Sequence, residues 1–291
     1  MTHEHRLVII AVIYNSHPET LQFAESIGNC FDRVAQLILV DNSPDQPDAT
    51  FTEKIRTYDF ITYLRAGSNA GYFHGAEIGL QHYLENGNGY PEWIIVSNVD
   101  IIFQTPDFLK KLDAIDAGHD IGVIAPAIIS KTWKTDLNPY LVSRIPLKKL
   151  QFLQAMYANP VIHNGYVLLY YLKKFLRMTF RRGYSGAPGK TNQSQIIYAP
   201  HGSCIIFNHN YFERGGTLNH ISFLFGEEIF VAETARQINM KVVYHPELQV
   251  CHDEHTSIGN FISGRINAFY RQSLKDILHQ YYPGADQPAS K

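Results

Sequence analysis

Residues 93–103 read W-I-I-V-S-N-V-D-I-I-F, two runs of large apolar residues on either side of a short polar segment. That segment contains Ser97, Asn98 and a single carboxylate, Asp100. A carboxylate at the end of a buried strand is costly in free energy unless a partner compensates for its desolvation. The sequence therefore predicts a turn, an arginine or a metal ion beside Asp100.

Earlier segments repeat this pattern of an apolar strand that ends in polar residues. Strand-like runs begin at Leu7, Gln36 and Ile61, and helix-length segments separate them, including one from 70 to 85. The alternation predicts an α/β fold with a mostly parallel central sheet, flanking helices, and ligands beyond the carboxyl ends of the strands. The polar strand ends are Asn15-Ser16, Asp41-Asn42-Ser43, Ser68-Asn69 and Ser97-Asn98-Val99-Asp100. Turns and helix caps would explain one such end, but four in succession favour a binding crevice.

Composition bounds the class of protein. The 291 residues are 45% hydrophobic, enough for a large buried core. The formal net charge is -2, so bulk charge gives no reason to expect a nucleic-acid partner. The three cysteines are far apart and lack C-x-x-C spacing, which is typical of a reducing compartment. A polar amino terminus and the absence of a membrane-length apolar run predict a cytoplasmic location.

The middle of the chain has an unusual charge distribution. No acidic residue lies between Asp136 and Glu213. The centre of this window, residues 166–182, mixes Leu, Phe and Tyr with basic residues, as in a helix that lies in a membrane interface. A helix packed on the core, with solvated Lys and Arg, is the alternative interpretation. The basic residues are Arg144, Lys148, Lys149, Lys173, Lys174, Arg177, Arg181, Arg182 and Lys190.

Three features of the first half point to a nucleotide ligand. Asn98 and Asp100 occupy alternate positions of an extended segment, which suits a hard divalent cation that shares its oxygen ligands with phosphates. Asp41 can accept hydrogen bonds from a nucleoside. Gly71 and Gly75 let the backbone approach a phosphate at a helix start. The pattern G-x-G-x-x-G is absent, which argues against a dehydrogenase.

The order of these motifs resembles family-2 inverting glycosyltransferases, especially the bacterial rhamnosyltransferase-like branch that builds surface polysaccharides. The resemblance extends from Val8 to Arg271. The motifs that carry it are V-I-I-A-V-I-Y-N-S, L-V-D-N-S, N-A-G-Y-F-H-G-A, S-N-V-D, A-P-H-G-S-C, G-E-E and V-C-H.

The resemblance implies a GT-A fold with a helical basic insert and a C-terminal helix. It implies a nucleotide-sugar-binding half at 1–130, the insert at 131–195, and an acceptor-binding and catalytic half at 196–291, all in one integrated domain. The substrates would be a nucleoside-diphosphate sugar and a glycan acceptor, expected to be lipid-linked, with Mg²⁺ or Mn²⁺ as cofactor. Asp100 and His252 would bind the metal. The nucleotide sugar would be bound by Ala11, Tyr14, Asp41, Asn69, Gly71 and Asn98.

The segment G-E-E matches the place where the family often has Glu-Asp, whose second acid is the general base. Glu228 would then activate the acceptor hydroxyl, with Glu227 beside it as an acceptor-binding residue. Two departures from the family pattern stand out. Asn98 replaces the Asp that is commonly first in the metal motif, and Glu228 replaces Asp at the base.

Two other functions stay open from the sequence. A nucleotidyltransferase that makes sugar nucleotides could use a similar sheet, but it would be expected to have a Gly-rich basic loop after the first strand, and A-V-I-Y-N-S-H-P has neither Gly nor Lys. A non-catalytic relative of the same fold is the other alternative, and Asn98 is its only support. Residues 144–182 are predicted to contact the inner membrane leaflet or a second subunit of a homo-oligomer.

Overall fold

The computed structural model describes residues 7–30, 36–87, 89–159, 161–162, 165, 193–253 and 264–282. The chain divides into two compact units. The larger comprises Met1–Arg144, Ser194–Phe223 and Glu227–His255. The smaller comprises Ile145–Gln193, Leu224–Gly226 and Thr256–Lys291.

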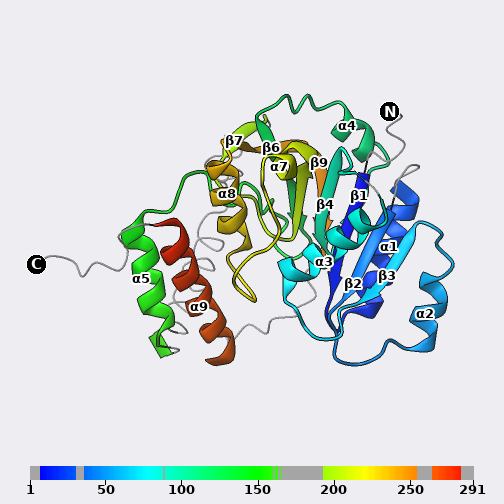
Figure 1. Cartoon of the computed structure of the whole chain (residues 1–291), viewed down its shortest axis with the longest axis horizontal. Helices are drawn as coiled ribbons and strands as arrows, with labels where there is room; N and C mark the ends of the chain where they lie inside the picture. The colour runs from blue at the N-terminus through cyan, green and yellow to red at the C-terminus, as the bar shows by residue number, and fades with distance from the viewer. Residues whose placement is uncertain are drawn as a thin grey trace, which may run out of the picture. The chain divides into compact units, whose positions relative to one another are not determined.

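The first part of the larger unit is a parallel α/β layer (Figure 1). Its four strands are ordered β3-β2-β1-β4, and all three pairings are parallel. The alternation of strand and helix predicted from the sequence is confirmed here. The elements are β1 (Leu7–Ile13), α1 (His17–Cys30), β2 (Gln36–Asp41), α2 (Ala49–Ile55), β3 (Ile61–Arg65), α3 (Tyr72–Glu85) and β4 (Trp93–Asn98).

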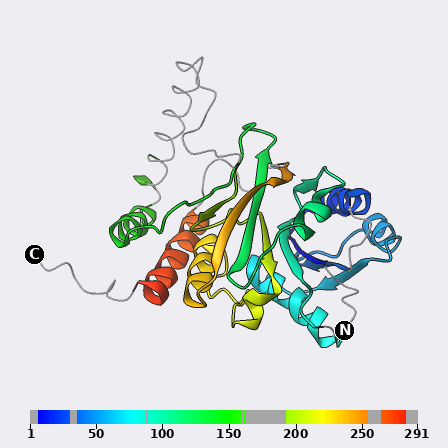
Figure 2. The same ribbon diagram turned by 90° about the horizontal axis from the view of Figure 1, so that it is seen from above.

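The second part of this unit extends the sheet with mixed strand directions. Beyond β4 the order is β8-β6-β9-β5, and β7 also pairs with β9. Only β6 and β9 run parallel here, as the two long strands in Figure 2; the other pairings are antiparallel. The prediction of a mostly parallel sheet therefore holds for the first half alone. The elements are β5 (Ile101–Phe103), α4 (Phe108–Asp113), β6 (Ile121–Ser130), β7 (Gln195–Ile197), β8 (Cys204–Asn208), α7 (His209–Glu213), α8 (Glu227–Gln237) and β9 (Lys241–His252).

Helices cover both faces of the parallel strands, which is why β1 reads as a continuous apolar run. On one face, Phe23 of α1, Phe51 of α2 and Phe108 of α4 pack with Ile9 and Trp93 in one buried cluster. On the other face α3 lies directly on the strands, because it has glycines where it crosses them. This close packing fixes where α3 begins.

The described part of the smaller unit consists mainly of α5 (Leu147–Tyr157) and α9 (Gly264–Tyr281). The two helices pack together, with the rings of Tyr157 and Tyr270 stacked at a centroid distance of 4.8 Å. The Tyr282 hydroxyl also donates to the Ile145 carbonyl at 2.8 Å. The predicted C-terminal helix is thus confirmed, and within the described ranges no helix is long and apolar enough to cross a membrane.

Candidate active site

The polar strand ends gather at one edge of the sheet, because β1, β2 and β4 are parallel neighbours (Figure 1). Ile13 pairs with Asp41, and Val12 pairs with Asn98. Tyr14 follows β1 at the same edge, and its side chain is exposed. Side chains that are far apart in the sequence are therefore brought together here.

Asp41 ends β2, and its carboxylate is buried and already hydrogen-bonded. His17 Nε2 lies 3.0 Å from Oδ2, the Tyr63 hydroxyl donates to the same oxygen, and the Ser43 N–H donates to Oδ1 at 2.8 Å. Burial acts to raise the pKa of Asp41, but these hydrogen bonds outweigh it, so the pKa lies below its ordinary value. Asp41 is an ionised group that braces the strand end, and its contact with a nucleoside stays a prediction.

Helix α3 begins directly after Gly71, whose φ is +89° and ψ 173°. The Gly71 N–H donates to Asn69 Oδ1 at 3.0 Å, and its carbonyl accepts from Asn42 Nδ2 at 2.9 Å. One turn on, a Cβ at Gly75 would lie 2.9 Å from Val12 of β1. These contacts hold the amino terminus of a 14-residue helix at the polar edge, where its backbone N–H groups favour an anion.

The two predicted metal ligands, Asp100 and His252, meet across the β5–β9 ladder. Ile101 pairs with His252, so Asp100 lies beside it. His252 Nε2 is 3.1 Å from Asp100 Oδ2. The other oxygen, Asp100 Oδ1, is buried and has no hydrogen-bond partner among the described residues. A buried carboxylate oxygen in this condition is costly, so a ligand there would be favourable.

His201 extends this cluster. Its ring centroid is 6.2 Å from that of His252, and its Nδ1 is 2.9 Å from Ser203 Oγ. Burial, together with the nearby His252, lowers the pKa of His201 to about 4, although the Asp100 charge acts in the opposite direction. His201 is therefore a neutral imidazole at physiological pH.

Glu228 lies in the first turn of α8, with its carboxylate against Gly202. A Cβ at Gly202 would lie 3.0 Å from Glu228 Oε1. Burial raises the pKa of Glu228, and hydrogen bonds from the N–H groups of Glu228 and Gly202 offset this only in part. A carboxylate with a raised pKa accepts a proton more readily, which is the property required of a general base.

Tyr72, which the sequence reasoning missed, connects these groups. Its hydroxyl donates to the Gly202 carbonyl at 3.1 Å. Its pKa is raised by burial and then by nearby acidic groups that include Glu227, Asp100 and Glu228. Tyr72 and the predicted base Glu228 thus both contact Gly202. The only available signal was its position in N-A-G-Y-F-H-G-A, at the expected start of a helix.

The remaining predicted residues differ in how they can reach a ligand. Ala11 is fully buried between β2 and β4, so its side chain belongs to the core, and contact of this residue with a ligand stays a prediction. Asn98 is half-buried, and its N–H donates to the Ser203 carbonyl at 2.9 Å. Glu227 is buried beside Glu228.

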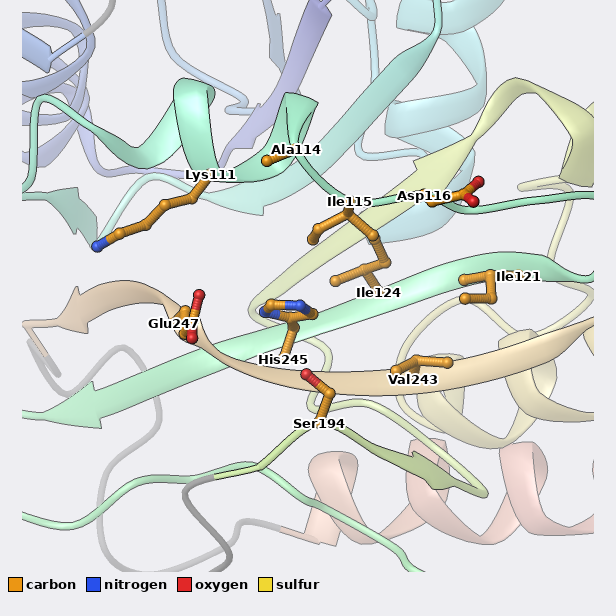
Figure 3. Close-up of a pocket in the computed structure, with 10 residues that line it drawn as sticks. All are labelled: Lys111, Ala114, Ile115, Asp116, Ile121, Ile124, Ser194, Val243, His245 and Glu247. Atoms are coloured by element: carbon orange, nitrogen blue, oxygen red, sulfur yellow. The ribbon is translucent and has the colours of Figure 1, made fainter.

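A pocket of about 390 Å³ lies away from these residues, between α4 and the strands β6 and β9 (Figure 3). Its lining includes Lys111, His245 and Glu247, and none of the predicted site residues. Among the described residues, no three or more His, Cys, Asp or Glu side chains are arranged to hold a metal.

Two curated relatives are similar to the chain in sequence, although no protein-family model matches it. The low-salt glycan biosynthesis hexosyltransferase Agl10 of Haloferax volcanii is 25% identical over 81% of the chain. The match covers 63% of Agl10, so the chain spans under two thirds of this relative. The N-acetylglucosaminyl-diphospho-decaprenol L-rhamnosyltransferase of Mycobacterium tuberculosis is 20% identical, over 92% of the chain and 82% of the relative.

Solved structures show the same fold. GalNAc-T7, crystallised with UDP, GalNAc and Mn²⁺, superposes with a TM-score of 0.61 at 14% identity, over 93% of the chain and 48% of that protein. TarS residues 1–349 of S. aureus give a TM-score of 0.51 at 10% identity, over 94% of the chain and 72% of theirs. The family resemblance and the fold predicted from the motifs are both confirmed: the chain is a homologue of glycosyltransferases and has the GT-A fold.

Proposed function

We propose that the protein transfers a sugar from a nucleoside-diphosphate sugar to a hydroxyl of a glycan acceptor, with inversion, in the synthesis of a bacterial surface polysaccharide. The observation that carries the proposal is the position of residues 201–202, where Gly202 contacts Glu228 and the His201 ring adjoins His252, the partner of Asp100. An inverting displacement needs one base on the acceptor side and stabilisation of the leaving diphosphate on the other. The site offers one candidate for each task.

Glu228 is proposed as the base. Its raised pKa favours proton acceptance, and the Gly202 N–H holds the carboxylate in place. Glu227, buried beside it, is proposed to contact the acceptor. On the opposite side, Asn69 and Gly71 are proposed to place the amino terminus of α3 against the diphosphate. Asp41 would hold the nucleoside end of this crevice in shape.

A divalent cation fits Asp100 and His252. The buried, unpartnered Oδ1 of Asp100 is a hard oxygen ligand, and His252 adds a nitrogen that Mn²⁺ accepts better than Mg²⁺ does. Two protein ligands leave positions for phosphate oxygens. The bound ion would supply positive charge that stabilises the leaving nucleoside diphosphate.

The test is product formation by purified protein from a panel of nucleoside-diphosphate sugars. The probe acceptor is a short-chain lipid diphosphate that carries N-acetylglucosamine, chosen because the Mycobacterium tuberculosis relative is named for such a substrate. Wild type should form a glycosylated product by mass spectrometry, and Asp100→Ala should lose most turnover while it keeps its fold. The matched control is Asp59→Ala, because Asp59 is an exposed acid before the amino end of β3. No product with any donor, or equal turnover in all three proteins, would contradict the proposal.

We also propose that the basic part of the chain holds the protein at an anionic membrane surface, close to a lipid-linked acceptor. The predicted contacts Lys173, Lys174, Arg177, Arg181 and Arg182 lie outside the described residues. In the described part, α5 exposes Lys148, Lys149 and Phe152, and Val161 and Ile162 are exposed after it. Basic side chains beside exposed apolar ones suit an anionic interface, at about 1 kcal/mol per Lys near the surface.

Liposome co-sedimentation tests this location. Changing Lys148 and Lys149 together to Gln should weaken binding to anionic vesicles, whereas the matched pair Lys110 and Lys111 on α4, changed in the same way, should not. Added salt should also release wild type, because it screens exposed charges. If both double variants bind like wild type, or wild type does not bind, the segment is a packing or subunit surface instead.

A further inference from the structure

Residues 138–141, which follow β6, are fixed beside His201 by hydrogen bonds. The Asn138 side chain is buried, accepts from the His201 N–H at 2.8 Å, and donates to a backbone carbonyl of β6 at 2.8 Å. Leu141 then pairs with Ala199 through backbone hydrogen bonds in both directions, at 3.2 and 3.0 Å. Tyr140 lies between these two anchors, so its backbone is held on both sides.

Tyr140 nevertheless leaves 46% of its surface exposed. Its ring packs perpendicular to that of His201, with centroids 5.6 Å apart and ring planes at 89°. His201 in turn adjoins His252, which contacts Asp100. The exposed ring of Tyr140 is thus connected to the proposed metal ligand Asp100 through the rings of His201 and His252. Tyr140 lies in the sequence Y-L-V, which contains no motif that would mark it as a site residue.

Two consecutive residues connect this ring with the proposed base, because His201 packs against Tyr140 and Gly202 contacts Glu228. The acceptor hydroxyl must reach Glu228, which is held by Gly202, and Gly202 directly follows His201 in the chain. Of the groups proposed for the donor, those that bind the nucleotide lie at the ends of β1 and β2 and at the start of α3, whereas the metal ligand His252, with Asp100 beside it, adjoins His201. A sugar that presents its hydroxyl to Glu228 therefore has Tyr140 within its surroundings.

We propose that Tyr140 is a specificity-determining residue that stacks against a sugar ring of the acceptor. This inference rests on the proposed function and adds the substrate group that Tyr140 recognises. Sugar rings carry faces rich in C–H groups, and the negative face of an aromatic ring attracts such positively polarised hydrogens. Because Tyr140 is anchored before binding, little conformational entropy is lost when the sugar stacks on it.

The experiment measures acceptor KM, donor KM and kcat with the same N-acetylglucosamine lipid diphosphate. Tyr140→Ala should raise acceptor KM about tenfold and leave donor KM and slow donor hydrolysis unchanged. Tyr140→Phe and Tyr140→Trp keep an aromatic face and should stay within about threefold of wild type. The control is Tyr90→Ala, because Tyr90 is 37% exposed and stacks on Phe212, outside the proposed site.

The possible results distinguish a failure of the proposed stacking role from a failure of the proposed glycosyltransferase activity. If wild type transfers sugar and Tyr140→Ala keeps the wild-type acceptor KM, the stacking role is wrong and the transferase proposal stands. A rise in donor KM as large as that in acceptor KM would indicate general damage and also contradict the role. If Phe fails to rescue, the hydroxyl and not the ring is recognised. If wild type neither transfers nor hydrolyses any donor, both proposals fall.

Discussion

Gly71 is expected to be irreplaceable for both conformational and steric reasons. Its φ of +89° and ψ of 173° lie in a region that is essentially restricted to glycine, at a cost of roughly 1–3 kcal/mol for other residues. A Cβ there would also lie 2.1 Å from the Phe223 carbonyl oxygen, a backbone atom that cannot rotate away. Such overpacking costs about another 1–3 kcal/mol. Gly71→Ala should therefore lower the free energy of unfolding by about 2–6 kcal/mol.

Gly67→Ala is the matched control. Gly67 also has a positive φ, +75°, but a Cβ there would meet nothing within 4 Å. Only the conformational cost remains, about 1–2 kcal/mol for a left-handed residue. Guanidinium unfolding curves of the two variants and wild type give the loss in free energy of unfolding, provided that the dependence on denaturant concentration has the same slope in all three. The difference between the two variants is then the steric part of the loss at Gly71.

The expected result is that Gly71→Ala loses clearly more stability than Gly67→Ala. Its nucleotide-sugar affinity should fall as well, because the substitution displaces the start of α3. Equal losses in the two variants would show that the Phe223 segment yields at little cost. The contact of Gly71 with the Phe223 carbonyl would then not fix the amino terminus of α3.

Two further predictions follow from the shifted pKa values. Asp41→Asn should cost roughly 2–4 kcal/mol at neutral pH, because the amide presents N–H donors where the carboxylate accepted hydrogen bonds. Because the pKa of Asp41 is lowered in the folded protein, its ionised carboxylate stabilises the fold at neutral pH, and this stabilisation is lost as the pH falls. The difference in free energy of unfolding between wild type and Asp41→Asn should therefore shrink below about pH 4. A difference that stays constant from about pH 7 to 3 would contradict this. For Glu228 the sign is opposite: its raised pKa means that ionisation costs stability as pH rises through the folded-state pKa. Glu228→Gln should thus be at least as stable as wild type at pH 8, and its turnover should be roughly 10²- to 10⁴-fold lower. The wild-type turnover should fall on the acid side of its pH profile, at a pH above 4.5, and the variant should not show this fall. If the fall in turnover survives the substitution, Glu228 is not the base.

Local chemistry in the sequence was enough to predict the first half of the fold. Buried parallel strands are continuous apolar runs, and their polar ends mark the sheet edge, so the positions of Asp41 and Asp100 could be read directly. The order of the second half could not. Insertion of β8 as an antiparallel strand between β4 and β6 depends on strand direction, which hydrophobic periodicity does not contain.

The environment of each site residue was harder to predict than its position. His17 and Tyr63, which cover Asp41, lie 24 and 22 residues away from it in the sequence. The contact of Tyr72 with Gly202 spans 130 residues. Such contacts follow from strand register and helix placement. The sequence therefore showed which residues could bind a ligand, but not which of them are already hydrogen-bonded within the protein.

Gly202 explains why these distant parts act together. Its N–H is bonded to the Glu228 carboxylate, and its carbonyl accepts from the Tyr72 hydroxyl. Gly202, two residues before β8, therefore contacts both the proposed base and the first residue of α3. A side chain at this position would crowd Glu228 Oε1, at 3.0 Å from the added Cβ, so the carboxylate would have to move by a few tenths of an ångström. The backbone of Gly202 thus fixes the positions of the proposed base and of the proposed phosphate-binding start of α3 relative to each other, before a substrate binds.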